Sequence, residues 1–371
     1  MQETSSSSGP ASPSPGPLPE TLPPPDVSVA DVLACDYVCW YPAFEKVALP
    51  SLILPLPAPV LAYLRDSASL VVPQECQAEM NHSHHDRLSE DEEEGHESLG
   101  AGDAPGSPWS SSEDVSATCP TFPDFTRQIR TSLTRLGGNA FCKLNWSAPR
   151  DATWLALGHS LRCHQASQIY LLLKGSDLVG HDLHRPFEQC SEPPEPHIRV
   201  PYSLILKPWL DINPGHEFRA FVRHGRLVGV SQRDVSTFFD HLLADRVNIL
   251  GDIRSFFGEY IQSRFHLAHY TFDVVRSTKD RVQLVDFAPW GGVTDPLLFD
   301  WHELANLSPD SETLCRFIPT AAGIQPNGLR QYSLPRDMVD LATGQDPLKL
   351  MDFLQLQTRT DRPGTPDDEQ G

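Results

Sequence analysis

Residues 270–287 read YTFDVVRSTKDRVQLVDF, and this stretch decides the fold class. Two apolar runs, Tyr270 to Arg276 and Val282 to Phe287, flank the polar segment Ser277 to Asp280. Alternating apolar runs on either side of a short polar turn predict two antiparallel strands that form a hairpin.

Two carboxylates interrupt the apolar pattern of this hairpin. Asp273 lies inside the first run, and Asp286 lies near the end of the second. An isolated buried carboxylate costs several kcal/mol, so each side chain needs a partner. One interpretation is a magnesium ion that carries substrate phosphates, because Mg²⁺ prefers oxygen ligands. The other is that each carboxylate pairs with an arginine or caps a backbone group, and the pattern leaves both open.

A second predicted hairpin precedes the first one in the chain. Glu217 to Val222 alternates apolar and polar side chains, and Arg226 to Ser231 follows the turn residues His224-Gly225. Arg219 lies in the first strand of this hairpin, and Arg233 lies just after the second. We expect both to face one cleft. Either arginine alone is equally typical of a salt bridge at a sheet edge.

A basic loop follows the predicted strand Ala140 to Leu144. It reads KLNWSAPRD from Lys143 to Asp151. Lysine, arginine and backbone N–H groups can reach phosphate oxygens, although the loop has none of the glycines of a Walker loop. An ordinary loop whose basic residues pair with local acids is the alternative, and the two interpretations stay equally open.

Helical and strand patterns over the rest of the chain favour an α+β fold. Helices are predicted at Val60 to Leu64, Phe122 to Leu136, Leu161 to Leu173, His241 to Phe265 and Leu348 to Leu356, with a strand at Ser203 to Leu206 and a strand or turn at Asp151 to Leu157.

Composition divides the chain into a folded body and three irregular segments. Residues rich in Ser, Pro and Gly, or in acidic side chains, bury too little apolar surface to offset the entropy of ordering. We expect a body at 31–357, with disordered segments at 1–30, 74–118 and 358–371.

Charge and hydropathy exclude several kinds of partner. The formal net charge is -20, and such a chain repels nucleic-acid backbones. No apolar run approaches the roughly 20 residues that a membrane-spanning helix needs. The eight scattered cysteines lack paired zinc spacing, which favours reduced thiols. These features indicate a cytoplasmic protein that binds neither nucleic acid nor membrane.

Five longer stretches resemble the cell division cycle protein 123 family. They are WYPAFEKVALPSLILPLP (40–57), KLNWSAPRDATW (143–154), PGHEFRAFVRHGRLVGVSQRD (214–234), VDFAPWGGVTDPLLFDW (285–301) and LPRDMVDLATG (334–344). The resemblance covers about Cys35 to Gln357. It implies an ATP-grasp-like fold, with two lobes of mainly antiparallel sheet and a nucleotide cleft between them.

The resemblance also implies a function and a set of site residues. Members of the family are ATP-binding factors that assemble eukaryotic translation initiation factor 2 through its gamma subunit. We do not expect catalytic turnover of ATP by this chain. Carried over to this chain, ATP and its phosphates would contact Lys143, Asn145, Ala148, Arg150, Leu206, Lys207, Trp209, Arg219 and Arg233, and Asp273 and Asp286 would hold Mg²⁺.

The sequence departs from the family at three positions near this site. Ala288 stands where the resemblance implies a metal-binding asparagine, and Gly292 where it implies a glutamate. Pro208 lies in the hinge strand and offers no backbone N–H to an adenine. The alternatives to an assembly factor are therefore an ATP-grasp ligase or phosphotransfer enzyme, and a scaffold that has lost magnesium–ATP binding.

Overall fold

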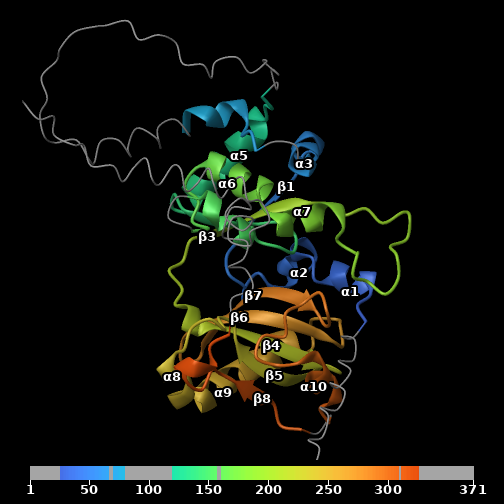
Figure 1. Ribbon diagram of the computed structural model, residues 1–371, viewed down its shortest axis with the longest axis vertical. Helices are drawn as coiled ribbons and strands as arrows, with labels where there is room; N and C mark the ends of the chain where they lie inside the picture. Colours follow the sequence, from blue (N-terminus) through green and yellow to red (C-terminus); the bar gives the residue numbers. More distant parts are fainter. Residues whose placement is uncertain (1–25, 67–69, 80–118, 157–159, 309–310, 326–371) are drawn as a thin grey trace, which may run out of the picture.

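The computed structural model describes residues 26–66, 70–79, 119–156, 160–308 and 311–325. A three-stranded sheet and a five-stranded sheet lie one above the other along the long axis (Figure 1). We call the parts of the chain around them the three-stranded lobe and the five-stranded lobe. Two helices, α1 (Val29–Ala34) and α2 (Tyr37–Phe44), lie where the lobes meet.

The five-stranded sheet contains both predicted hairpins. Its strand order is β7-β6-β4-β5-β8, and all pairs are antiparallel except β5 with β8. His224 and Gly225 have φ of 50° and 67°, as a tight hairpin turn between β4 and β5 requires. The bounds are β4 Glu217–Arg223, β5 Arg226–Gln232, β6 Tyr270–Thr278, β7 Arg281–Pro289 and β8 Leu314–Arg316.

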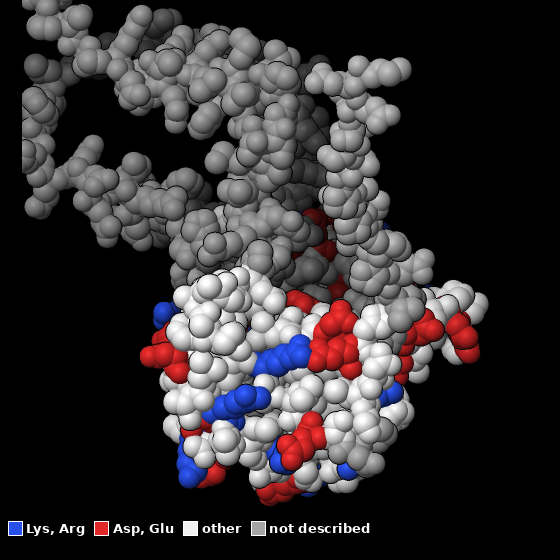
Figure 2. Space-filling view, turned by 60° about the horizontal axis from the view of Figure 1, so that its bottom comes forward, with Lys and Arg blue, Asp and Glu red and all other residues white. Residues whose placement is uncertain are grey.

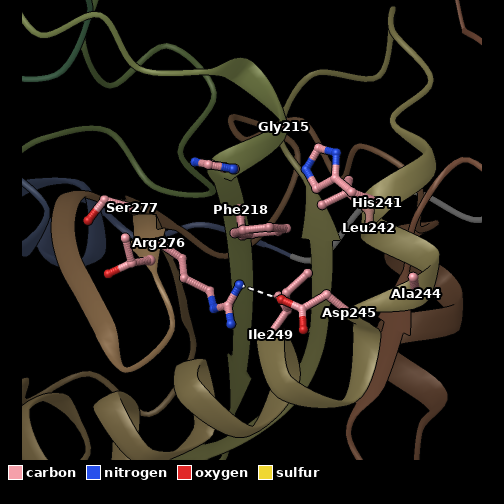
Figure 3. A pocket seen from close by; sticks show the side chains of 11 residues that line it. Gly215, Phe218, His241, Leu242, Ala244, Asp245, Ile249, Arg276 and Ser277 are labelled. Atoms are coloured by element: carbon pink, nitrogen blue, oxygen red, sulfur yellow. Dashed lines mark hydrogen bonds and ion pairs between the residues drawn. The ribbon is translucent and has the colours of Figure 1, made fainter.

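One long helix was expected at 241–265, and the structure has three shorter segments there. Asp245 separates the first two, because its carboxylate accepts hydrogen bonds from Arg276 at 2.7 Å and from Asn248 at 2.6 Å (Figure 3). This pairing fixes Asp245 outside helical geometry, at φ −97° and ψ 8°. The segments are α8 (Asp240–Ala244), α9 (Arg246–Phe256) and a π-helical turn (Phe257–Ile261), and α10 (Trp301–Asn306) lies elsewhere on this lobe.

The three-stranded sheet has the order β1-β3-β2, with both pairs antiparallel. Helices cover it on the side away from the five-stranded lobe (Figure 1). Its elements are β1 Leu52–Pro55, β2 Ala140–Lys143, β3 Ser203–Pro208, α3 Ala58–Arg65, α5 Pro123–Arg135, α6 Ala166–Lys174 and α7 Asp177–His184. Short 3-10 turns occur at Gln74–Cys76, Arg150–Leu155, Pro214–His216 and Ala321–Gly323.

The helix α2 packs on the five-stranded lobe through aromatic rings. Trp40 and Phe44 each lie 5.2 Å from the ring of Phe287 on β7, and Phe287 stacks on Phe265 at 4.0 Å. Burying such rings is favourable both through the apolar area removed from water and through ring geometry. This packing holds α2 next to the strand that carries Asp286.

One predicted helix begins later in the structure than expected near the basic loop. Residues 161–165 are not helical, because Cys163 pairs with Ala140 through two backbone hydrogen bonds of 2.8 Å. Residues 150–155 form a 3-10 turn, which is the second of the two forms expected for this segment. Asp151 is buried there and accepts hydrogen bonds from Ser176 and from the backbone at the start of α7. Its carboxylate therefore anchors the basic loop to that helix.

The predicted domain boundaries are shifted at two places. The described chain begins at Asp26, and α1 starts at Val29, slightly before the expected body. Residues 74–79 were expected in the acidic insert, but Glu75 and Glu79 both bond to Arg130 of α5. The predictions for the rest of that insert, for both chain ends and for the helix 348–356 lie outside the described residues. Within the described ranges, no helix is long and apolar enough to cross a membrane.

Candidate functional site

The register of the five-stranded sheet aligns three charged residues on one face. Arg219 on β4 lies opposite Asp273 on β6, which in turn lies opposite Asp286 on β7. Residues directly opposite each other in a sheet point to the same side. The two carboxylates predicted from the sequence are therefore neighbours, and the arginine of the preceding hairpin lies beside them.

Asp273 is neutralised by two arginines of its own lobe. Arg219 donates to both carboxylate oxygens, with Nε–Oδ1 at 2.8 Å and Nη2–Oδ2 at 2.9 Å, and Arg233 donates from Nε to Oδ2 at 2.9 Å. Burial opposes ionisation of Asp273, but the two guanidinium groups outweigh it and hold the pKa of the carboxyl below its usual range. This side chain is fixed as an anion.

Asp286 is paired across the lobe boundary. Its partner is the Lys143 ammonium at the end of β2, and both groups lie close to α2. Lys143 Nζ lies 5.0 Å above the ring centre of Tyr37, and Lys207 Nζ from β3 lies 4.6 Å from the same centre. Two lysines of one lobe thus meet a carboxylate of the other over a single aromatic ring.

The buried position of Lys207 changes its protonation. Burial, together with the nearby positive charge of Lys143, lowers the pKa of Lys207 to about 7 against the opposing effect of Asp286. Its ammonium donates to the Val285 carbonyl oxygen at 2.9 Å. The site therefore contains a lysine that gains or loses charge near neutral pH.

Arg150 approaches the same cluster from the three-stranded lobe. Its side chain is exposed, and it lies close enough to Arg233 and Arg219 for their positive charges to act on it. It makes no side-chain hydrogen bond or ion pair to the described residues. Ala148 lies in the same loop and accepts a backbone hydrogen bond from Arg150 at 2.8 Å. Arg150 is thus a cation next to the cluster without a fixed partner among these residues.

We call Lys143, Lys207, Arg150, Arg219, Arg233, Asp273 and Asp286 the cation cluster. Its five basic groups outnumber its two carboxylates, in a chain whose net charge is -20. On the face of the five-stranded lobe shown in Figure 2, basic and acidic side chains are interspersed. The concentration of positive charge in the cation cluster is therefore local, and its chemistry suits a small anion with several oxygens.

Three other predicted contact residues serve the fold. Asn145 is fully buried, and its amide binds the Asp36 carboxylate at 2.8 Å and the Ser203 backbone N–H at 2.9 Å. Leu206 points into the core of the three-stranded lobe, and Trp209 donates to Asp211 at 2.9 Å. A nucleotide contact from the Asn145 side chain would require these buried bonds to break.

The donor set of the cluster does not fit a magnesium site. Both oxygens of Asp273 accept from guanidinium groups, and Asp286 is bound to an ammonium. Ala288, two residues beyond Asp286 on the same face of β7, carries only a methyl group. Among the described residues, no group of three or more His, Cys, Asp or Glu side chains is placed to hold a metal.

Sequence reasoning missed Tyr37 as part of the site. Its buried ring contacts both lysines, and its hydroxyl bonds to Ser51 at 2.7 Å. No pattern around residue 37 signals this role, because Tyr37 and the two lysines are more than 100 residues apart in the chain. Only the packing of α2 between the lobes brings them together.

A separate cavity of about 440 Å³ lies between α8 and the five-stranded sheet (Figure 3). Phe218, Leu242 and Ile249 line it, together with the imidazoles of His216 and His241. None of the site residues predicted from the sequence lines this cavity. Arg276 on its wall is paired with both Asp245 and Asp252, so this cavity has no unpaired arginine of the kind that the cation cluster offers to an anion.

Known proteins resemble this chain over most of its length. The translation initiation factor eIF2 assembly protein of Xenopus tropicalis is 39% identical, covering 88% of this chain and 96% of the relative. The protein of the same name from Danio rerio is 38% identical over 88% of this chain and 93% of its own. The solved structure of Cdc123 from Schizosaccharomyces pombe matches 80% of this chain and 100% of its own, with a TM-score of 0.62 and 28% identity.

These comparisons agree with the fold seen here. The α+β, ATP-grasp-like class expected from the sequence is confirmed, whereas the nucleotide in its cleft stays a prediction. A family model described as D123 matches residues 40–342, which include both hairpins, the basic loop and α2 from Trp40 onward. The chain therefore belongs to the D123 family, that of cell division cycle protein 123.

Proposed function

We propose that this protein assists the assembly of eukaryotic translation initiation factor 2, that it does so by binding the gamma subunit, and that it holds ATP at the cation cluster. The observation that carries the proposal is the match to eIF2 assembly proteins over 88% of this chain and up to 96% of theirs. A match of this extent includes both lobes and the boundary between them, so the whole folded unit is shared.

The geometry of the cation cluster supports an anionic ligand at the lobe boundary. Lys143 and Lys207 come from the three-stranded lobe, and Arg219 and Arg233 come from the five-stranded lobe. A ligand whose phosphates contact both pairs would favour one relative position of the lobes. Such a ligand could therefore set the shape of the surface that a partner subunit meets.

The partner is tested by direct binding. The full-length chain is immobilised and exposed to purified gamma subunit, with the alpha subunit as a matched control, in the presence and absence of ATP. We expect saturable binding of gamma and none of alpha. Failure of gamma to bind, with the immobilised chain shown to be folded, would refute the proposed partner while leaving nucleotide binding to be judged separately.

The nucleotide is tested with the purified chain alone. Calorimetry with ATP should show saturable binding, and Lys143→Met should weaken it by roughly 10-fold or more, since a charge-assisted bond contributes about 1.5–3 kcal/mol. Equal affinity of wild type and variant would place the nucleotide elsewhere.

A further inference from the structure

We infer that the cation cluster binds a polyphosphate anion without a divalent cation, because ammonium and guanidinium groups already occupy the positions at which a metal would bind. The inference rests on the proposed function for the location of the phosphates. It adds how their charge is neutralised, and it predicts a binding behaviour opposite to that of a magnesium-dependent site.

The first step concerns the oxygens that a metal would need. Asp273 Oδ1 accepts from Arg219, and Oδ2 accepts from both Arg219 and Arg233 at 2.9 Å. Asp286 Oδ2 is bound by Lys143, and its Oδ1 accepts from the backbone N–H of Phe287 at 3.1 Å. Every oxygen of the two carboxylates therefore has a donor, and a metal would have to displace buried cations.

The second step concerns the missing third ligand. Mg²⁺ demands near-octahedral oxygen coordination, usually from one or two carboxylates together with waters and phosphates. Residue 288 lies on the same face as Asp286, where a side-chain oxygen could complete such a set, but alanine has none. The residue opposite it, Thr271, directs its hydroxyl to the Ala288 carbonyl at 3.3 Å. The neighbouring strand β6 therefore supplies no side-chain oxygen at this position as a replacement metal ligand.

The third step concerns the donors that remain for an anion. The whole guanidinium fork of Arg150 has no hydrogen-bond partner among the described residues. Arg233 uses only Nε in the bonds that the described part of the chain provides, which leaves its two terminal nitrogens. Lys207 uses one of its three donor positions, on Val285. Planar forks and an ammonium are the groups that bind phosphate oxygens best.

The charges agree with this assignment. A triphosphate without a metal carries three to four negative charges, and magnesium would cancel two of them. Lys143, Arg150, Arg219 and Arg233 are cations beside Asp273 and Asp286, and Lys207 adds a further charge when it is protonated. Glu217 and Asp36 lie near these groups and offset part of that positive charge. Adding a divalent cation to the ligand would bring like charges together at partly buried sites, which is unfavourable.

The test compares ATP and inorganic tripolyphosphate by calorimetry, in EDTA and in magnesium chloride at equal ionic strength. We expect both ligands to bind in EDTA, with magnesium strengthening binding by no more than about 3-fold, which is under 1 kcal/mol. Saturable binding that appears only with magnesium would overturn the inference and leave the ATP part of the proposed function intact. Tripolyphosphate binding in EDTA without any ATP binding would support the inference and refute the ATP part of the proposed function.

Variants assign the binding to the cluster. Arg150→Gln should weaken tripolyphosphate binding in EDTA by about 10-fold or more, because it removes a charge-assisted fork. Arg127→Gln is the matched control, since that arginine is 71% exposed on α5 and should leave affinity unchanged. Unchanged binding by Arg150→Gln would overturn the inference, as would failure of both ligands to bind in EDTA.

Discussion

Asp273 and Asp286 are cross-strand neighbours, but their surroundings differ in kind. Asp273 is held by two arginines from its own sheet. Asp286 is held by a lysine from the other lobe, with a second lysine nearby over the same tyrosine ring. The first pairing fixes the interior of one lobe, whereas the second connects two lobes.

The choice of cation makes this difference functional. Arginine stays charged under all ordinary conditions, so the network around Asp273 cannot relax by losing a proton. Lysine shifts its pKa readily when it is buried, so Lys207 near Asp286 can change charge with pH or with a ligand. The region around Asp273 therefore keeps a fixed charge, whereas the charge of the region around Asp286 can change. We call the latter the adjustable region.

Removing each carboxylate should give the largest contrast. Asp273→Ala leaves two guanidinium groups without their partner, and we expect a loss of about 3–5 kcal/mol in the free energy of unfolding. Asp286→Ala should cost less, on the order of 1–2 kcal/mol, because Asp286 pairs with a single cation and is more exposed than Asp273. Urea unfolding followed by circular dichroism measures both values.

The matched control for these two variants is Asp124→Ala. Asp124 pairs with Arg127 on α5, and the two side chains are 83% and 71% exposed. An exposed ion pair contributes little, so the change should stay within about 1 kcal/mol. If Asp286→Ala proves as costly as Asp273→Ala, the proposed contrast between lysine and arginine partners is incorrect.

The adjustable region should also produce a pH dependence. The pKa of Lys207 is lowered to about 7 in the folded protein, whereas an unfolded lysine titrates near 10.4. Between these values the unfolded state binds more protons, so this residue makes stability rise with pH, by at most about 1.4 kcal/mol per unit. Below pH 7 both states are protonated and the contribution to the slope vanishes.

Lys207→Met isolates that contribution. Stability is measured from pH 6 to pH 9 by chemical denaturation, and the variant should show a flatter profile than the wild type above pH 7, in the sense required by the lowered pKa. Parallel profiles for the two proteins would mean that Lys207 titrates normally and that the region around Asp286 is not adjustable by pH.

The smallest effect on stability is expected at Arg150. Its guanidinium makes no side-chain hydrogen bond within the described residues, so Arg150→Gln should change the free energy of unfolding by no more than about 0.5 kcal/mol. Thermal and urea unfolding measure it. A loss of several kcal/mol would show that Arg150 belongs with the rigid arginines near Asp273, and not with the groups that remain for a ligand.

Much of the site could be predicted from local sequence. The alternation at 217–222 and the hairpin at 270–287 indicate strands, turns and faces, so Asp273 and Asp286 were expected on neighbouring strands. The pairing of Arg219 with Asp273, 54 residues apart, was not predicted from these local patterns. Side chains in a strand point alternately to its two faces, so the face on which each side chain lies can be predicted from sequence. The break of the predicted helix at Asp245 was missed, because its cause is an ion pair with Arg276, 31 residues away.

The sequence by itself determined the two hairpins, the α+β class and the family of this protein. The tertiary structure decided which charges meet: Asp273 with two arginines, and Asp286 with a lysine from β2. It also decided that the Asn145 side chain hydrogen-bonds to buried Asp36 and that the ring of Tyr37 contacts two lysines. The physical reason is that strand pattern depends on neighbours in the chain, whereas the partner of a buried charge depends on packing between distant segments.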